Sequence, residues 1–237
     1  MRVAALADVH ANAPALAAVL DEVARERPDL IVFCGDLTWG PFPQETLALV
    51  RGLGLPMRFV RGNADRAVGT LLDERGEWIL AQHEPADLVF LSVFEPAVVA
   101  DVDGLGPVRF CHGSPRSDEE CVTERTPRER VAELMDGVLE HVVATAHVHV
   151  SYDREIGGVR LLSPGSVGLP YEADGGARWA LLGPGVELRR TDYDVAAAAE
   201  LIRASADPAA ERIARLLLEP PAREEVIADA EERVFAG

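Results

Sequence analysis

The chain of 237 residues has few cysteines, few aromatic side chains and no long apolar run. Its three cysteines, Cys34, Cys111 and Cys121, are an odd number without the spacing of a disulfide framework. We expect buried thiols at Cys34 and Cys111 and a reducing compartment. No stretch approaches the 18 or more apolar residues of a spanning helix, which argues against a membrane protein. No signal peptide precedes the first expected strand, so we expect a cytoplasmic location.

Positive charge is scarce as well. Lys and Arg number 23 against 40 Asp and Glu, so the formal net charge is -17. Such a surface repels polyanions, and the sequence has no cluster of basic residues of the kind that holds a nucleic acid. We therefore expect no stable nucleic-acid complex and no membrane partner. A small phosphorylated substrate agrees with this charge if a local positive centre, such as a metal, receives it.

The first half of the sequence alternates between strand and helix patterns. Asn12 and Pro14 are signals for the start of one helix and Pro43 for another, each followed by apolar residues at helical spacing, and a third helix is expected over 65–72. Short apolar runs predict buried strands at 2–7, 30–34 and 57–61. This order predicts an α/β fold with a parallel sheet and crossover helices.

The second half is less regular. Helices are expected in part of 78–94 and over 129–139. Further strands are expected at 98–102, 108–111, 142–146, 159–162, 178–182 and 186–190. We predict one domain over residues 1–193 and a C-terminal helical extension over 194–237, packed on the same domain. This extension ends in an acidic helix at 223–235 and could be a homodimer contact, a lid or simple packing.

Three turns after the first three expected strands each carry a metal-type ligand. Asp36 lies 28 residues after Asp8, and Asn63 lies 27 residues after Asp36, close to the ~30 residues of a βαβ unit. These side chains should therefore meet at the carboxyl edge of a parallel sheet, where open α/β sheets bind ligands. The first turn also carries His10, and glycines before Asp36 and Asn63 allow tight turns.

Two later segments contribute three histidines. Cys111-His112-Gly113 ends a strand, and Ala146-His147-Val148-His149 follows another. Side chains at i and i+2 of an extended segment point to one side, so His147 and His149 should face the same way, as should Asp8 and His10. One such His alone is more often structural, and an Asp after a strand is often a helix cap. Four of the six histidines at strand-end turns favour a metal site.

The combined set of four His, two Asp and one Asn suits Mn, Fe or Zn better than it suits a structural zinc site with Cys ligands. Seven ligands are too many for one ion but fit two ions that share a carboxylate, for which Asp36 is the natural bridge. Ions roughly 3.5–4 Å apart would hold a bridging hydroxide and clamp a phosphate. Two divalent ions would also outweigh the charges of Asp8 and Asp36 and create a local positive centre.

These five motifs, in this order, resemble those of the calcineurin-like metallophosphoesterases over residues 1 to about 190. The segments at 40–41, 112–116 and 164–168 are similar to a small bacterial branch related to diadenosine tetraphosphatases. The resemblance implies a four-layer α/β/β/α sandwich with two mixed sheets. It also implies a dinuclear metal-dependent phosphoric ester hydrolase, with Mn favoured, acting on phosphodiesters or nucleotides or, alternatively, on dinucleoside polyphosphates.

The resemblance also implies roles for individual residues. One ion would be held by Asp8, His10, Asp36 and His149, and the other by Asp36, Asn63, His112 and His147. Asp36, Asn63 and His112 are the expected catalytic residues. Arg66 and Arg116 lie beside ligand motifs and are candidates for binding the substrate phosphate, with a surface salt bridge as the equal alternative. Asp65 either orients a ligand or caps a helix.

The sequence departs from the family pattern at Ala64, where many members have a His that protonates the leaving group or holds the phosphate. General acid catalysis is typically worth ~10²–10⁴-fold, so unactivated alkyl leaving groups are disfavoured, whereas a polyphosphate needs little protonation. His83 is the unassigned upstream His, and a surface or core role is the stronger interpretation for it. Ala146 replaces a usual Gly, a small change. The segment at 37–40 lacks an Arg-Gly element, which argues against a protein phosphatase.

A non-catalytic scaffold is the rival interpretation. One retromer subunit resembles this fold, lacks the same His and works as a binding platform. The complete set of competent ligands in this sequence favours the enzyme.

Overall fold

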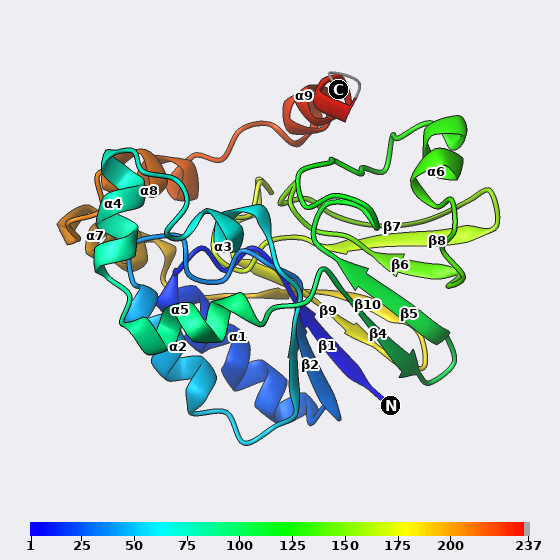
Figure 1. Cartoon of the computed structure of the whole chain (residues 1–237), viewed down its shortest axis with the longest axis horizontal. Helices are drawn as coiled ribbons and strands as arrows, with labels where there is room; N and C mark the ends of the chain where they lie inside the picture. Colours follow the sequence, from blue (N-terminus) through cyan, green and yellow to red (C-terminus); the bar gives the residue numbers. More distant parts are fainter. Residues whose placement is uncertain (235–237) are drawn as a thin grey trace.

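In the computed structural model, which describes residues 1–234, a five-stranded mixed sheet carries the turns with Asp8, Asp36 and Asn63 (Figure 1). Its strand order is β10-β9-β1-β2-β3. Strands β1, β2 and β3 are parallel to one another, with Ala5 of β1 opposite Val32 of β2. Strand β9 pairs antiparallel with β1, and the edge strand β10 pairs antiparallel with β9. The strands are β1 (Val3–Leu6), β2 (Leu30–Phe33), β3 (Met57–Phe59), β9 (Ala177–Leu182) and β10 (Val186–Thr191).

A second mixed sheet of five strands has the order β4-β5-β6-β8-β7. Its inner strands β5, β6 and β8 are parallel, and the outer strands β4 and β7 pair antiparallel with their neighbours. The strands are β4 (Ala97–Val102), β5 (Gly106–Cys111), β6 (Val142–Ala144), β7 (Ser151–Ile156) and β8 (Val159–Pro164). The expected α/β fold with two mixed sheets is therefore confirmed.

Nine helices surround the sheets within the described residues. The first, α1, begins as expected, because Asn12 Oδ1 accepts a hydrogen bond from Ala15 N at 3.2 Å and Pro14 lies in the first turn. The helices are α1 (Ala13–Glu26), α2 (Pro43–Arg51), α3 (Asn63–Ala67), α4 (Glu74–Ala81), α5 (Pro85–Ser92), α6 (Arg128–Leu134), α7 (Val195–Ala204), α8 (Ala210–Leu218) and α9 (Arg223–Val234).

The packing divides into four layers. Alternate residues of β1 point to opposite faces, so Val3 and Ala5 join the core between the two sheets while Ala4 and Leu6 pack against α1, α2 and α5. On the far side, the second sheet packs against α6 through Val131 and neighbouring residues. Figure 1 shows α1, α2 and α5 grouped on one side of the first sheet and α6 beyond the second. All three cysteines are buried and unpaired.

The C-terminal helices cross from one sheet to the other. Helices α7 and α8 form an apolar cluster with Leu169 and Phe42, whereas α9 packs through Ile227 against Val148 and Val150, next to the His-x-His segment (Figure 1). No helix among residues 1–234 is long and apolar enough to span a membrane. The domain division at residue 193, the homodimer and the cytoplasmic location stay predictions.

Several element boundaries differ from the expected ones. Helix α3 covers Asn63–Ala67 rather than 65–72, because Gly69 takes a positive φ of 80° just after it. Helix α6 ends at Leu134 rather than 139, before Gly137 with a φ of 75°. Strand β7 was not expected: as an edge strand it carries charged residues that mask its alternation. The final helix begins at Arg223 as expected, and residue 235 lies outside the described part of the chain.

Candidate metal centre

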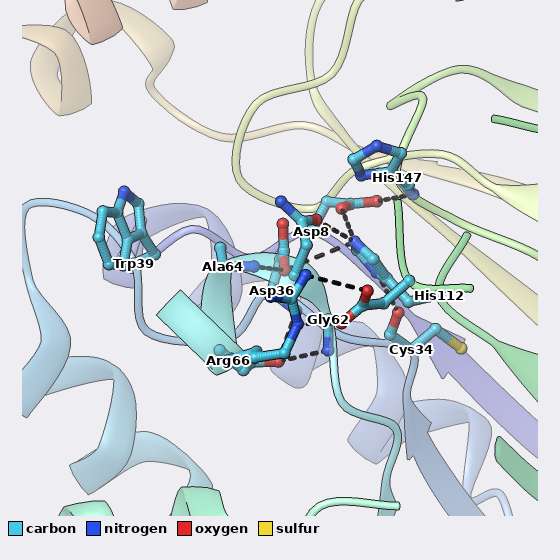
Figure 2. Close-up of polar contacts among 12 residues, drawn as sticks. Asp8, Cys34, Asp36, Trp39, Gly62, Ala64, Arg66, His112 and His147 are labelled. Atoms are coloured by element: carbon cyan, nitrogen blue, oxygen red, sulfur yellow. Dashed lines mark hydrogen bonds and ion pairs between the residues drawn. The ribbon is translucent and has the colours of Figure 1, made fainter. Parts of the chain in front are cut away.

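The seven expected ligands converge where the carboxyl ends of both sheets meet. Asp8, Asp36 and Asn63 follow the parallel strands β1, β2 and β3, and His112 follows β5. His147 and His149 lie in the segment between β6 and β7. Figure 2 shows Asp8, Asp36, His112 and His147 directed toward a common centre. Five short sequence motifs from two sheets thus come together at one site.

The first group of side chains consists of Asp8, His10 and His149. His10 Nε2 and His149 Nε2 are 3.0 Å apart, and Asp8 Oδ1 is 3.5 Å from His149 Nε2 and 4.0 Å from His10 Nε2. Ligand atoms bound at roughly 2.1 Å to one ion in tetrahedral or octahedral geometry lie about 3.0–3.4 Å from each other. The two distances to His149 are at or close to this range, and the distance between Asp8 and His10 is wider, so the three side chains lie close enough together to be candidate ligands of a single ion.

The second group consists of Asp36, His112 and His147, with Asn63 beside it. His112 Nε2 is 3.0 Å from Asn63 Oδ1 and 3.5 Å from Asp36 Oδ1. The other carboxylate oxygen of Asp36, Oδ2, lies 3.6 Å from His10 Nε2 in the first group. Asp36 thus presents one oxygen to each group, which is the position that a bridging carboxylate requires. The assignment of these residues as ligands stays a prediction.

Backbone carbonyl groups orient three of the four imidazoles. The Nδ1–H groups of His112, His149 and His10 donate to Cys34 O at 2.9 Å, Leu169 O at 2.7 Å and Trp39 O at 3.3 Å, respectively. Since a carbonyl only accepts, each Nδ1 carries a proton and Nε2 is the nitrogen left for a metal ion. Metal-binding histidines characteristically have such a partner on their other nitrogen.

Two observations indicate that the site is built for cations. The Nε2 atoms of His10 and His149 face each other with unprotonated lone pairs, which repel at 3.0 Å unless a positive charge lies between them. In addition, the buried Asp8 Oδ1 has no hydrogen-bond partner. An unpartnered buried carboxylate oxygen is costly, and its cost is offset when it coordinates a metal ion. The residues present therefore fit a metal centre.

The electrostatics of the bare protein agree with this interpretation. Burial raises the pKa of Asp8 to about 8, and burial lowers the pKa of His147 to about 4. Burial also lowers the pKa of His10 and His149. For His112, burial is outweighed by the carboxylates of Asp36 and Asp8, which raise its pKa to about 10. Without metal ions, the raised pKa values favour the protonated forms of Asp8 and His112. Metal ions bound at these side chains would displace the protons.

The backbone geometry of the ligand turns differs from the expected one. Asp8, His10, His147 and His149 have positive φ values of 51°, 47°, 70° and 59°, so the i, i+2 pairs do not lie on extended segments. Asp36 also has a positive φ, of 57°. These side chains are brought together by turns with left-handed backbone conformations. The alternation of side chains along a strand plays no part. Such conformations cost of order 1 kcal/mol or more each and cluster at functional sites.

Gly35 and Gly62 leave room for the ligands. Gly35 has a φ of +97°, and a Cβ there would overlap the His112 ring. Gly62 has an extended backbone, but a Cβ there would overlap Asp36 Oδ1. The expected tight turn is thus found at Gly35, whereas Gly62 is required for close approach.

The site opens into a cavity of about 500 Å³ that is lined in part by His10, Asp36, Asn63, His147 and His149. Such a volume is within the usual range of small-molecule sites, ~300–1,000 Å³. The same cavity is also lined by residues that the sequence did not indicate as site residues, among them Arg75, Tyr171, Leu216, Arg212 and Arg233. They reach the site from α4, from the loop before β9 and from α8 and α9, so no local motif marks them.

Arg66 and Arg116 line a second, smaller cavity of about 240 Å³ that His112 also lines. Arg66 donates to Asp118 and Glu119, and Arg116 donates to Glu120. Both side chains are about half exposed. The structure therefore places them near the site with their guanidinium groups already paired, and their role toward a substrate stays a prediction.

The side chain of His83 is not part of the cavity lining described above. It is buried, its Nδ1 donates to Ile79 O at 2.8 Å, and its Nε2 lies 3.0 Å from Thr38 Oγ1. This arrangement agrees with a core role. Ala64, in contrast, lines the metal-site cavity, and its backbone N–H donates to Asp36 Oδ1 at 2.8 Å (Figure 2).

Comparisons with known proteins agree with the fold. The calcineurin-like phosphoesterase superfamily domain matches residues 1–182. A hypothetical protein from Pyrococcus horikoshii has a similar structure, with a TM-score of 0.79 and 19% identity over 91% of this chain and 97% of its own. A metallophosphoesterase from Sphaerobacter thermophilus has a TM-score of 0.73 and 27% identity over 92% and 98%.

More distantly, an archaeal phosphodiesterase has a TM-score of 0.52 and 16% identity over 80% of this chain and 99% of its own. The search of curated proteins finds no match.

Proposed function

This chain belongs to the calcineurin-like phosphoesterase superfamily, and we propose that it hydrolyses small phosphoesters, phosphodiesters above all, at a centre of two divalent metal ions. One observation carries the proposal: Asp36 presents one oxygen toward His10 and the other toward His112, between two groups of competent ligands. The names of two structural relatives, a metallophosphoesterase and a phosphodiesterase, support the same class of reaction.

The residues divide between the two ions as follows. Asp8, His10, Asp36 and His149 would hold one ion, and Asp36, Asn63, His112 and His147 the other. The mixture of nitrogen and oxygen ligands suits Mn, Fe or Zn, and we propose Mn. When bound, the ions supply positive charge that stabilises phosphoryl oxygens and lowers the pKa of a water molecule.

The protein itself positions these groups before substrate arrives. The carbonyls of Cys34, Leu169 and Trp39 fix the imidazole orientations, and the N–H of Ala64 fixes one oxygen of Asp36. Because this arrangement exists beforehand, little reorganisation accompanies the reaction. The arginines lining the cavity add positive charge in a protein that is otherwise acidic.

The side chain of Ala64 restricts the substrate. It lines the cavity where many family members carry a His, and Ala can neither donate nor accept a proton. Substrates whose leaving group is stable without protonation are therefore favoured, such as aryl phosphodiesters. The same observation favours dinucleoside polyphosphates as the second candidate, since their leaving groups are phosphates.

A panel of substrates tests the proposal. Purified protein loaded with Mn is given bis-p-nitrophenyl phosphate, p-nitrophenyl phosphate and diadenosine tetraphosphate, with Asp36→Ala treated in parallel. We expect turnover by the wild type that is lost in Asp36→Ala, and the preferred substrate identifies the class. A wild type that binds metal but hydrolyses none of the three with Mn, Fe or Zn would instead support the scaffold interpretation.

A further inference from the structure

The C-terminal helices close one side of the metal-site cavity. The family domain ends at residue 182, yet Ile202 of α7, Arg212, Ile213 and Leu216 of α8, and Arg233 of α9 all line the cavity. Helix α8 turns an arginine and two apolar side chains toward the space above the metal ligands. This wall is therefore formed by residues that follow the matched family domain.

The three arginines that line the cavity differ in their partners. Arg75 forms a two-pronged ion pair with the buried Asp207, at 2.9 Å for each hydrogen bond. Arg233 is paired with Asp229 one turn earlier in α9. Arg212 forms no hydrogen bond or ion pair with any side chain or carbonyl in residues 1–234. Arg212 is therefore the cavity-lining arginine whose charge is not already neutralised by an acidic side chain of the described residues.

Helix α8 is held in place by apolar packing and by an ion pair, and this fixes the position of Arg212 at the cavity. Ala210, Ala214 and Leu217 are buried in the cluster with α7. Asp207, just before α8, is held by Arg75 of α4, and Figure 1 shows α4 and α8 side by side. The helix therefore has one face fixed in the core and presents Arg212 to the cavity.

The charge of Arg212 reaches the metal-ligand side of the cavity. The Tyr171 ring stacks on the His149 ring with centroids 4.9 Å apart. Tyr171, His149, Arg212 and Arg233 all line the same cavity. The two guanidinium groups therefore share the cavity with a residue that contacts an expected ligand histidine.

We propose that Arg212 binds a second anionic group of the substrate, remote from the phosphate that is hydrolysed, while Ile213 and Leu216 contact the uncharged part between the two. The proposal rests on the proposed phosphoesterase function. The proposal narrows the range of expected substrates to small organic phosphoesters that carry a further phosphate or carboxylate group. A guanidinium group binds a phosphate or a carboxylate through charge-assisted hydrogen bonds.

Two chromogenic substrates that differ in one phosphate test this proposal. They are the p-nitrophenyl ester of thymidine 5′-phosphate and the same ester carrying a 3′-phosphate. Cleavage of the aryl ester bond releases p-nitrophenol from both, so the lack of a proton donor at Ala64 should limit neither. The variants are Arg212→Met, Arg212→Lys and, as the matched control, Arg215→Met, which removes an exposed arginine from the same helix that does not line the cavity.

We expect Arg212→Met to lower kcat/KM about 10-fold for the 3′-phosphorylated ester, mainly through KM, which is the effect of losing a charge-assisted contact. For the ester without the 3′-phosphate, kcat/KM of Arg212→Met should differ less than twofold from that of the wild type. Arg212→Lys should recover part of the loss, and Arg215→Met should behave as the wild type. Equal effects of Arg212→Met on both esters, or none on either, would overturn the proposal.

A binding measurement separates this proposal from the proposed function. If the wild type hydrolyses neither ester nor any substrate of the panel above, the phosphoesterase function fails, and calorimetry with thymidine 3′,5′-bisphosphate and thymidine 5′-phosphate on metal-loaded protein decides the role of Arg212. Weaker binding of the bisphosphate alone in Arg212→Met supports the proposal. Unchanged or equally weakened binding of both nucleotides refutes it.

Discussion

Asp65 holds the backbone of Asp36 from behind the metal centre. Asp65 Oδ2 accepts a hydrogen bond from Asp36 N at 2.8 Å, and Oδ1 accepts one from Leu37 N at 2.8 Å. Oδ2 also accepts from Gly62 N at 2.9 Å, which caps α3. One buried carboxylate thus joins the turn that carries Asp36 to the turn that carries Asn63. The cap expected of Asp65 is present, and its role in orienting a metal ligand stays a prediction.

Replacing Asp65 with Asn should weaken metal binding. An amide offers one acceptor oxygen and one NH₂ group, so at least one of the three backbone N–H groups would face a donor. We expect Mn affinity to fall about 10–100-fold in Asp65→Asn, the usual loss when a residue that supports metal ligands is changed. Isothermal titration calorimetry with Mn measures this affinity.

Asp73→Asn is the control, because Asp73 caps α4 through Gly76 N and does not contact the ligand turns. Asn and Asp are equally good caps, so this variant should bind Mn as the wild type does. If Asp65→Asn also binds Mn normally, Asp65 is a helix cap and no more.

Gly62→Ala should disturb the same region by steric overlap. A Cβ at Gly62 would overlap Asp36 Oδ1, so Asp36 or the turn must move. Overpacking of this kind typically costs ~1–3 kcal/mol. We expect a lower Tm and weaker Mn binding. Gly54→Ala is the matched control, since nothing lies within 4 Å of a Cβ there, and it should leave both quantities unchanged. Equal behaviour of the two variants would contradict the account of the turn.

Ala64→His should widen the range of leaving groups. Ala64 lines the cavity beside Asp36, so an imidazole there would reach a bound phosphoester. General acid catalysis typically contributes ~10²–10⁴-fold. We expect kcat for alkyl phosphodiesters to rise at least about 10-fold, with little change for p-nitrophenyl esters. A similar change for alkyl and aryl esters would show that leaving-group protonation is not what Ala64 limits.

Asp87 should make the stability of the fold depend on pH. Burial would raise the pKa of Asp87, but hydrogen bonds from Gln44 and Arg51 of α2 outweigh it and hold the pKa below its ordinary value of 3.8. The folded state therefore favours the ionised carboxylate. The resulting stabilisation is complete above pH ~4, the unfolded pKa, and is lost as the pH falls through the lower folded pKa.

Urea unfolding of wild type and Asp87→Asn at pH 7 and at acidic pH measures this contribution. The wild type should be more stable at pH 7, and the difference in unfolding free energy should shrink below pH ~4. A difference that stays constant over this range would show that Asp87 does not carry the pH dependence.

The sequence was most informative where a signal is local. Short apolar runs followed by Asp8, Asp36 and Asn63 at nearly equal intervals predicted three parallel strands with ligands at one edge, and the structure has those strands and brings the residues together. The left-handed backbone at Asp8 and His147 was not predicted, because i, i+2 spacing carries no information about φ in a turn.

Features that depend on tertiary packing could not be predicted from the sequence. Arg212 and Arg233 lie far from every motif along the chain and approach the cavity because α8 and α9 pack on different parts of the domain. Strand β7 is recognisable through its pairing with β8, not through its charged sequence. Local patterns indicate candidate ligands, whereas the cavity wall formed by α8 and α9 follows from how distant helices pack.

The central claim is that Asp36 joins two metal ions. Electron paramagnetic resonance of protein titrated with Mn tests it most directly, because ions roughly 3.5–4 Å apart and linked by a carboxylate interact magnetically. We predict two Mn ions per chain with the spectrum of an interacting pair, and loss of that interaction in Asp36→Asn. A single Mn ion per chain, or two ions with independent signals that Asp36→Asn leaves unchanged, would contradict the account.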